Sequence, residues 1–344
     1  MSTLFSVIIP FYNRKDEIQE LLESLEKQTL PKDQFEVILV DDGSTDGTKE
    51  WVGEFEKRSS INFDYVWKER GGPGATRNFG MENAEGNIFV FIDSDCTALP
   101  DWLTRIKNEF ERDPSIQAFG GRDGARQEFS PLLKAINYSM TSFLTTGGMR
   151  GGTKKRLAKF YPRSFNMGIR RELYERIGGF GNLRHGQDIE FSHRILQSGA
   201  KVAYFSDSVV YHKRRKSLRI FFRQVFNWGV ARINLSRIDS AMLEPLHFAP
   251  AVGLWFTLMF TLFALFYRPV FPFWLLFVSL VGILLFGCGF HAAIKWKSVL
   301  TGFLVPVVMT IQIVGYGLGF TSAFIWRVLL KRGEFTGFVK RYYR

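Results

Sequence analysis

The sequence predicts a domain of the α/β class with a mostly parallel sheet, followed by membrane helices toward the C-terminus. Two observations support this prediction. Short β-branched runs alternate with segments of helical apolar spacing over the first part of the chain. Charged residues are common up to about residue 246 and scarce from residue 248 to residue 326 of the 344. The near-neutral mean hydropathy therefore averages a polar part and a strongly apolar part.

Strands and helices are expected to alternate in the N-terminal part. The run FSVIIP at residues 5–10 is typical of a buried parallel strand, because it is rich in β-branched residues and ends at proline. The expected strands span residues 5–10, 35–40, 61–67 and 87–92, and the expected helices span residues 16–28, 48–57 and 75–84. Right-handed crossovers would bring the carboxyl ends of the strands to one edge, where ligands bind in such sheets.

The second half of the globular part is less regular. We expect a strand or turn at residues 164–168, helices at 171–177 and 188–198, and short strands at 202–205 and 209–212. Gly199 follows the longer helix and is a typical C-terminal cap. The globular domain is therefore expected to cover residues 1–215.

Residues 216–246 are expected to form an amphipathic helical segment at a membrane surface. Between residues 217 and 237, an apolar stripe alternates with Arg219, Arg223 and Arg232. The pattern alone fits a helix that faces a protein core equally well. The apolar spans that follow favour the membrane.

Membrane helices are expected over residues 247–330, ahead of a basic tail at 331–344. The uncharged runs 248–267, 270–290 and 299–326 are each long enough to cross a bilayer. If the globular domain is inside, a third full span would place the basic tail outside, against the positive-inside tendency. Pro306 and the glycines at positions 315, 317 and 319 could bend the last run. We expect three spans, because that run is too short for two regular ones.

The remaining composition indicates the compartment and the kind of partner. Cys96 and Cys288 are the two cysteines, far apart in the chain, which favours a reducing compartment over a disulfide framework. The apolar run at residues 5–10 is too short for a signal peptide. We therefore expect a multi-pass protein of the inner (plasma) membrane with its globular domain in the cytoplasm. The net charge of +12 is concentrated near the apolar region, which favours lipid headgroups and phosphate ligands over nucleic acid.

Polar clusters follow three of the expected strands, at residues 12–13, 41–42 and 93–95. An Asp-Gly turn alone more often only caps a helix, but agreement at three strand ends indicates a site. In the DSD cluster at 93–95, one carboxylate can meet a nucleoside. The other can bind a divalent metal, Mg²⁺ or Mn²⁺, that bridges a diphosphate.

Several short motifs occur in a characteristic order: SVIIPFYN at 6–13, VDDGSTD at 40–46, GPGATRN at 72–78, DSD at 93–95 and GQDIE at 186–190. Together they resemble the family 2 glycosyltransferases, which have the GT-A fold, a Rossmann-like α/β architecture, over roughly residues 4–215. The stretch YHKRRKSLR at 211–219, with the apolar helices after it, is similar to the succinoglycan-type exopolysaccharide glycosyltransferases. Those enzymes extend a lipid-linked sugar at the cytoplasmic membrane face.

The resemblance implies a role for each matching residue. The general base would be Asp188, and the metal ligands would be Asp95 and His212. Residues implied to bind the nucleotide sugar are Pro10, Tyr12, Asp42, Arg77, Asp93, Arg214 and Arg215. Residues implied to meet the acceptor are Gln187 and Trp228. The family usually has glutamate where this chain has Gln187, which affects acceptor contacts rather than the base.

Two of these residues also have simpler interpretations. Asp188 could be the N-cap of the helix that follows it. His212 could be a surface histidine at the end of a strand. The glycine-rich basic segment at 147–156 could be an acceptor-side loop or an ordinary surface loop.

The function that the resemblance implies is transfer of a sugar, with inversion, from a nucleotide diphosphate sugar to a lipid-linked saccharide in cell-surface polysaccharide synthesis. A UDP-sugar is the expected donor. One alternative is a polyprenyl-phosphate monosaccharide synthase of the dolichyl-phosphate-mannose type. Another is a transporter subunit with a nucleotide-binding domain, which the scarcity of ionisable residues in the spans disfavours. Residues 224–228 (QVFNW) only approximate the Q-x-x-R-W signature of processive synthases, which favours single addition.

Overall fold

The computed structural model describes residues 4–124, 128–146, 160–213 and 217–338. The chain forms two compact units. Of the described residues, the first unit contains 4–124 and 160–213, and the second contains 128–146 and 217–338. Residues 128–146, which were expected in the globular domain, therefore group with the C-terminal helices.

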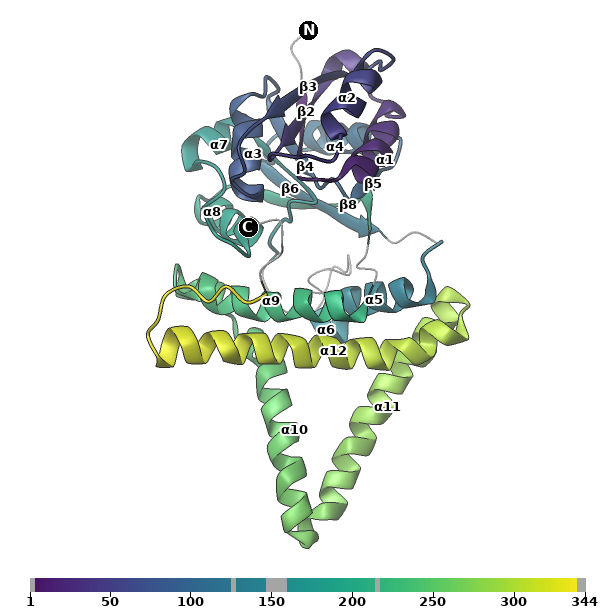
Figure 1. Ribbon diagram of the computed structural model, residues 1–344, viewed down its shortest axis with the longest axis vertical. Helices are drawn as coiled ribbons and strands as arrows, with labels where there is room; N and C mark the ends of the chain where they lie inside the picture. Colours follow the sequence, from purple (N-terminus) through teal and green to yellow (C-terminus); the bar gives the residue numbers. More distant parts are fainter. Residues whose placement is uncertain (1–3, 125–127, 147–159, 214–216, 339–344) are drawn as a thin grey trace. The chain divides into compact units, whose positions relative to one another are not determined.

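The described part of the first unit forms one eight-stranded sheet with the order β3-β2-β1-β4-β7-β6-β8-β5 (Figure 1). Strands β3, β2, β1 and β4 are parallel, β7 is antiparallel to both of its neighbours, and β8 pairs parallel with β6 and antiparallel with β5. The strands are β1 Phe5–Phe11, β2 Phe35–Asp41, β3 Asn62–Trp67, β4 Ile88–Ile92, β5 Cys96–Ala98, β6 Ala118–Gly124, β7 Asn166–Arg170 and β8 Val202–His212. The predicted mostly parallel α/β sheet is confirmed.

Helices cover both faces of this sheet. They are α1 Lys15–Glu26, α2 Thr48–Glu56, α3 Pro73–Glu82, α4 Trp102–Arg112, α7 Arg171–Ile177 and α8 Gln187–Gln197, with a 3-10 turn at Lys32–Gln34. Because successive side chains of a strand point to opposite faces, Val7 and Ile9 of β1 join the core with α1, α2 and α4. Ile8 joins the core with α3, α7 and α8 on the other face. Burial on both faces explains why β1, β2 and β4 are mostly apolar. The buried polar residues Ser6 of β1 and Glu36 of β2 hydrogen-bond to each other (2.6 Å).

The second unit is helical. Its helices are α5 Pro131–Thr141, α6 Phe143–Thr146, α9 Leu218–Ser236, α10 Ala249–Phe266, α11 Phe271–Trp296 and α12 Val299–Phe324, which continues as a π-helical turn at Ile325–Leu329. Short 3-10 turns lie at Ser240–Met242, Pro245–Phe248 and Arg268–Val270. Pro306 lies inside α12, and the helix continues through it.

Three helical stretches of this unit are long and apolar enough to cross a membrane: Pro245–Phe266, Arg268–Trp296 and Val299–Leu329. They coincide with the three apolar runs of the sequence. The side chains of α5, α9, α11 and α12 share one core, which explains why residues 128–146 group with this unit.

Candidate active site

The carboxyl ends of β1, β2 and β4 bring the three polar clusters to one edge of the sheet, as expected. The register of β1 and β2 places Phe11 opposite Asp41. Residues 12–13 and 41–42 therefore leave the sheet side by side. Residues 93–95 follow β4, which pairs with the other edge of β1. The edge is thus lined by carboxylates and hydrogen-bonding groups from three neighbouring strands.

Asp42 holds the turn that precedes α3. Its Oδ1 accepts hydrogen bonds from the Gly71 amide (2.8 Å) and from Lys68 Nζ (3.0 Å), and its Oδ2 accepts one from the Gly72 amide (2.9 Å). Each carboxylate oxygen can accept two such bonds, so Oδ2 retains one acceptor position among these contacts. Lys68, which follows β3, was missed by the sequence analysis.

The loop after β1 is tied to the loop after β2. The Asn13 amide donates to Ser44 Oγ (2.8 Å), and Asn13 Oδ1 accepts from the Thr45 amide (2.8 Å). The Lys15 amide donates to Asp46 Oδ2 (3.0 Å). Partial burial raises the pKa of Asp46, but hydrogen bonds from the Thr48 hydroxyl and from the Lys15 and Thr48 amides outweigh it and hold the pKa below its usual value.

Tyr12 and Pro10 lie at the same end of β1. The Arg70 guanidinium lies over the Tyr12 ring, 4.3 Å from its centroid. Pro10 is buried within β1. Tyr65 of β3 donates its hydroxyl to Asp41, and burial together with this bond raises the pKa of Tyr65 well above its usual value. Tyr65 therefore remains a neutral donor across the physiological range.

Arg77 and Asp93 form an ion pair between α3 and the end of β4. Arg77 Nη2 lies 2.6 Å from Asp93 Oδ1, and the guanidinium also donates to the Pro73 carbonyl (3.2 Å). The side chain of Arg77 is 8% exposed and that of Asp93 is 30% exposed. The structure thus joins two residues that the resemblance assigned separately to the nucleotide. Asp93 is the member of the pair that a ligand reaches more easily.

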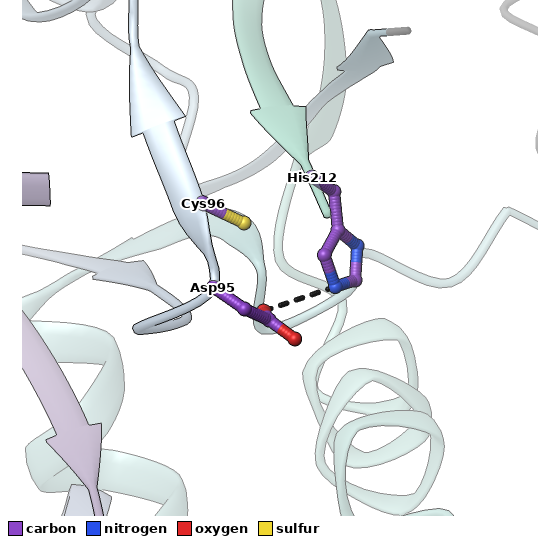
Figure 2. A group of neighbouring side chains, drawn as sticks. All are labelled: Asp95, Cys96 and His212. Atoms are coloured by element: carbon purple, nitrogen blue, oxygen red, sulfur yellow. Dashed lines mark ion pairs between the residues drawn. The ribbon is translucent and has the colours of Figure 1, made fainter. Parts of the chain in front are cut away.

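Asp95 and His212 meet where β5 pairs with β8. His212 Nε2 lies 3.0 Å from Asp95 Oδ1 (Figure 2). One ligand atom from each of Asp95, Cys96 and His212 lies within 4.8 Å of the others. Two ligands at right angles, each about 2.1 Å from an ion, lie about 3.0 Å apart, so the Asp95–His212 pair fits a divalent metal. Cys96 was missed as a neighbour of this pair, although it adjoins Asp95 in sequence.

Asp188 lies in the first turn of α8. Its Oδ2 is 3.1 Å from Arg163 Nη1, and its Oδ1 accepts from the Ile189 amide (3.0 Å). The N-cap position belongs to Gly186, which adopts a left-handed conformation (φ +83°). Arg163, which precedes β7, was missed because only the folded chain brings it to α8.

Gln187 lies against the start of α3. A Cβ atom at Gly74 would be 2.7 Å from Gln187 Nε2, so the glycine makes room for this side chain. Gln187, which departs from the usual glutamate, is therefore held next to Pro73 and Gly74 of α3. The same helix α3 also carries Arg77.

Residues 6–178 match the family model described as "Glycosyl transferase family 2". The chain belongs to this family. Glycosyltransferase AglE of Haloferax volcanii is 32% identical over 249 residues, which cover 69% of this chain and 78% of AglE. The poly(ribitol-phosphate) beta-N-acetylglucosaminyltransferase TarS of Staphylococcus aureus is 45% identical over 91 residues, which cover 26% of this chain and 16% of TarS.

Solved structures share the fold of this glycosyltransferase. The mannosyltransferase PcManGT of Pyrobaculum calidifontis, in complex with GDP-Man and Mn²⁺, aligns with a TM-score of 0.62 at 21% identity over 90% of this chain and 88% of PcManGT. TarS 1-349 of Staphylococcus aureus, in complex with UDP-GlcNAc, aligns with a TM-score of 0.52 at 23% identity over 93% of this chain and 91% of that one. The GT-A fold that the resemblance implied is confirmed.

The remaining expected site residues of this family 2 enzyme are not found at this edge of the described sheet. Arg214, Arg215 and the segment 147–156 fall outside the described residues. Trp228 lies on α9 in the second unit, where it packs against the core shared by α5, α9, α11 and α12. The described part of the first unit therefore brings together Tyr12, Asp42, Arg77, Asp93, Asp95, Gln187, Asp188 and His212 on neighbouring elements.

Proposed function

We propose that this glycosyltransferase moves a sugar, with inversion, from a nucleotide diphosphate sugar to a lipid-linked saccharide acceptor, in the synthesis of a cell-surface polysaccharide. The observation that carries the proposal is the arrangement at the carboxyl edge of the sheet. Hydrogen-bonding groups follow β1, β2 and β4 there, and the Asp95–His212 pair lies directly after β4 and at the end of β8. The Asp188 carboxylate follows Gln187, which lies against Gly74 in the first turn of α3. These are the groups needed to bind a donor and to accept a proton.

The nucleobase would lie among Pro10, Tyr12 and Asp42. The remaining acceptor position on Asp42 Oδ2 suits a base that offers a single ring N–H, as uracil does, and this supports a UDP-sugar. The Asp93 carboxylate would accept from the ribose hydroxyls while Arg77 holds it in place. The solved relatives contain GDP-Man or UDP-GlcNAc, so nucleotide sugars of two kinds are bound on this fold.

The diphosphate would lie next to Asp95 and His212. A divalent metal held by these two residues would neutralise the charge that develops on the leaving diphosphate. The carboxylate and imidazole suit Mn²⁺ or Mg²⁺, and PcManGT is a solved relative with Mn²⁺. We assign Arg214 and Arg215, which follow β8 in sequence, to the oxygens of the same diphosphate.

Asp188 would act as the general base. Its carboxylate takes the proton of the acceptor hydroxyl while that oxygen forms a bond to the anomeric carbon. The bond from the anomeric carbon to the diphosphate oxygen breaks in the same displacement, so the configuration inverts. Arg163, 3.1 Å from Oδ2, would orient the carboxylate, and Gln187 would donate to another acceptor hydroxyl.

The membrane helices support an acceptor that is itself held at a membrane. The second unit carries three stretches able to cross a bilayer, and Trp228 of this unit is our candidate for contact with the acceptor. The globular unit would lie on the cytoplasmic side of the plasma membrane. Family membership sets aside a transporter subunit, and it leaves polyprenyl phosphate as the alternative acceptor.

The test is sugar transfer by membranes that contain the full chain and a panel of labelled nucleotide sugars with Mn²⁺ or Mg²⁺. We expect Asp188→Asn to abolish transfer while it retains nucleotide binding, because the amide cannot take a proton. Asp207→Asn, at an exposed position of β8, is the matched control and should transfer normally. Full transfer by Asp188→Asn would refute the assigned base. A lipid product that releases one labelled monosaccharide in mild acid would favour the polyprenyl-phosphate alternative.

A further inference from the structure

In the second unit, α12 runs alongside α9 with the two backbones in direct approach. A Cβ atom at Gly319 would lie 2.0 Å from the Phe226 carbonyl oxygen, and one at Gly229 would lie 2.2 Å from the Tyr316 carbonyl oxygen. A Cβ atom at Gly315 would lie 2.6 Å from the Val225 side chain. Small residues at such a seam let helix backbones come this close. Residue numbers increase in the same direction along both helices, so the two run parallel.

The contacts extend over the second half of α12 and into the π-helical turn that follows it. Gln312 accepts a hydrogen bond from Ser139 of α5 (2.7 Å), and both side chains are buried. At the other end, Arg327 Nη1 donates to Asn234 Oδ1 of α9 (3.0 Å). Helix rise makes this stretch, from residue 312 to residue 327, about 22 Å long. Figure 1 shows α5, α9 and α12 lying side by side, whereas α10 and α11 extend away from them as a hairpin.

Charged side chains exclude α9 from the hydrocarbon layer. Arg219, Arg223 and Arg237 are exposed on or directly after this helix. An arginine at the centre of a membrane costs at least about 2.5–3.5 kcal/mol. Two of the exposed arginines lie on α9 itself, and the third follows its last residue. A helix with these charges lies at the surface of a bilayer. Because α12 is parallel to α9 and in contact with it, the stretch from 312 to 327 must lie at the same depth.

The hairpin of α10 and α11, in contrast to α9, exposes large apolar side chains. In the most apolar window of α10, 11% of the residues are buried within the protein, and in that of α11 none are. The corresponding share for α12 is 39%. Large side chains such as Phe263, Phe286 and Phe290 are exposed on α10 and α11. Helices that are apolar all round and exposed to this extent fit contact with lipid chains. α11 alone, with 26 residues, is about 39 Å long and can cross the hydrocarbon core.

We propose that only α10 and α11 cross the membrane, and that α9 and α12 together form a layer that rests in the lipid headgroup region of one face. The sequence favoured three spans because α12 is long and apolar. Two spans place residues 331–338 on the same face as α9. The turn between α10 and α11 then carries one charge, Arg268, and the positive charges at Lys295, Lys297 and Arg327 all lie on the other face. This distribution agrees with the positive-inside tendency.

The test is labelling of single cysteines, introduced into a Cys96→Ser/Cys288→Ser background, in intact cells or right-side-out vesicles with a membrane-impermeant maleimide. The exposed positions are Arg237→Cys after α9, Arg268→Cys in the hairpin turn and Lys331→Cys after α12. We expect Arg268→Cys to be labelled directly, and Arg237→Cys and Lys331→Cys to be labelled only after permeabilisation. Direct labelling of Lys331→Cys would show that α12 crosses the bilayer and overturn the proposal. Protection of Arg268→Cys would overturn it too, because the hairpin would not cross.

A second measurement does not depend on the cysteine variants. We expect a green fluorescent protein fused after Arg344 to fluoresce, and an alkaline phosphatase fused there to be inactive, since the first folds in the cytoplasm and the second only outside it. Active phosphatase would overturn the proposal. Neither readout uses sugar transfer, so failure here and failure of the proposed function are distinguishable.

Discussion

Substitution of Gly319 by alanine should separate α12 from α9 and destabilise the helical unit. The new Cβ would meet the Phe226 carbonyl oxygen at 2.0 Å, its carbonyl carbon at 2.8 Å and its Cα at 3.0 Å. All three atoms are backbone atoms, so no side chain can rotate away. The helices must therefore move apart by roughly 1 Å or more before the contact becomes an ordinary one.

The size of the effect follows from this displacement. Overpacking a well-packed interface costs about 1–3 kcal/mol, and a gap of 0.5–1 Å removes about a quarter to a half of the dispersion energy of the contacts beside it. We expect the upper end of this range, about 3 kcal/mol, because the obstacle is rigid. Gly282→Ala is the matched control, since nothing lies within 4 Å of its added Cβ on α11. It should be neutral or slightly stabilising, because alanine is the better helix former by about 1 kcal/mol.

The assay is thermal unfolding in detergent, followed with a dye that becomes fluorescent when it reacts with a thiol. In a Cys96→Ser background, Cys288 of α11 reports on the helical unit. A loss of 3 kcal/mol in a unit of this size should lower the Tm by about 6–12 °C. If Gly319→Ala and Gly282→Ala melted within about 1 °C of each other, the close approach of α9 and α12 would be refuted.

Two further predictions concern the first unit. Arg163→Gln should lower kcat about tenfold or more with little change in the KM for the donor, because Arg163 orients Asp188 rather than binding the nucleotide, and Arg163→Lys should restore part of kcat. The control is Arg105→Gln, in an exposed ion pair on α4. Equal kcat values for Arg105→Gln and Arg163→Gln would contradict the orienting role of Arg163. Partial burial raises the pKa of Glu26, but hydrogen bonds from Ser59 and Ser60 outweigh this effect and leave the pKa lowered. Glu26 therefore stabilises the fold above its unfolded pKa, and this stabilisation disappears as the pH falls through its folded pKa. Glu26→Gln should thus cost about 1 kcal/mol in denaturant unfolding at pH 7, and the cost should shrink as the pH falls through the folded pKa. A cost that did not change with pH would contradict the assignment.

Much of the globular fold could be predicted because its strands are buried on both faces. β1, β2 and β4 are mostly apolar, and the polar clusters at residues 12–13, 41–42 and 93–95 indicate where they end. β6 was missed because its sequence, AFGGRDG, has neither an apolar run nor alternation. It is a strand because β7 and β8 supply its hydrogen-bond partners, and its glycines allow close packing, with Asn166 lying 2.2 Å from a Cβ placed at Gly121.

The helix α4 was missed for a different reason. Trp102, Leu103, Ile106 and Phe110 have helical spacing and are all buried, so the signal was present in the sequence. The strand expected as two pieces, at 202–205 and 209–212, is the single strand β8, with its irregularity opposite Gly121 and Arg122 of β6. Local spacing identifies the existence of an element better than its continuity, because continuity depends on the neighbour it pairs with.

In the candidate site, too, some features could be predicted from local sequence and others could not. The residue types at the strand ends, Asp42, Asp93 and Asp95, could be read from short motifs. The pairings of the site carboxylates could not, because Lys68 meets Asp42, Arg77 meets Asp93 and Arg163 meets Asp188 only in the folded chain. An ordinary-looking arginine such as Arg163 has no local pattern that marks it.

The sequence by itself determined the chemistry of the motifs, the α/β class and the presence of three long apolar segments, since each is a property of one stretch of chain. Only the tertiary structure decided that His212 meets Asp95 across β5 and β8, and that Asp188 pairs with Arg163. It also decided that α12 packs along α9. Apolar length measures what a helix could cross, whereas its depth in a bilayer depends on the helix it packs against and on the charges that this partner carries.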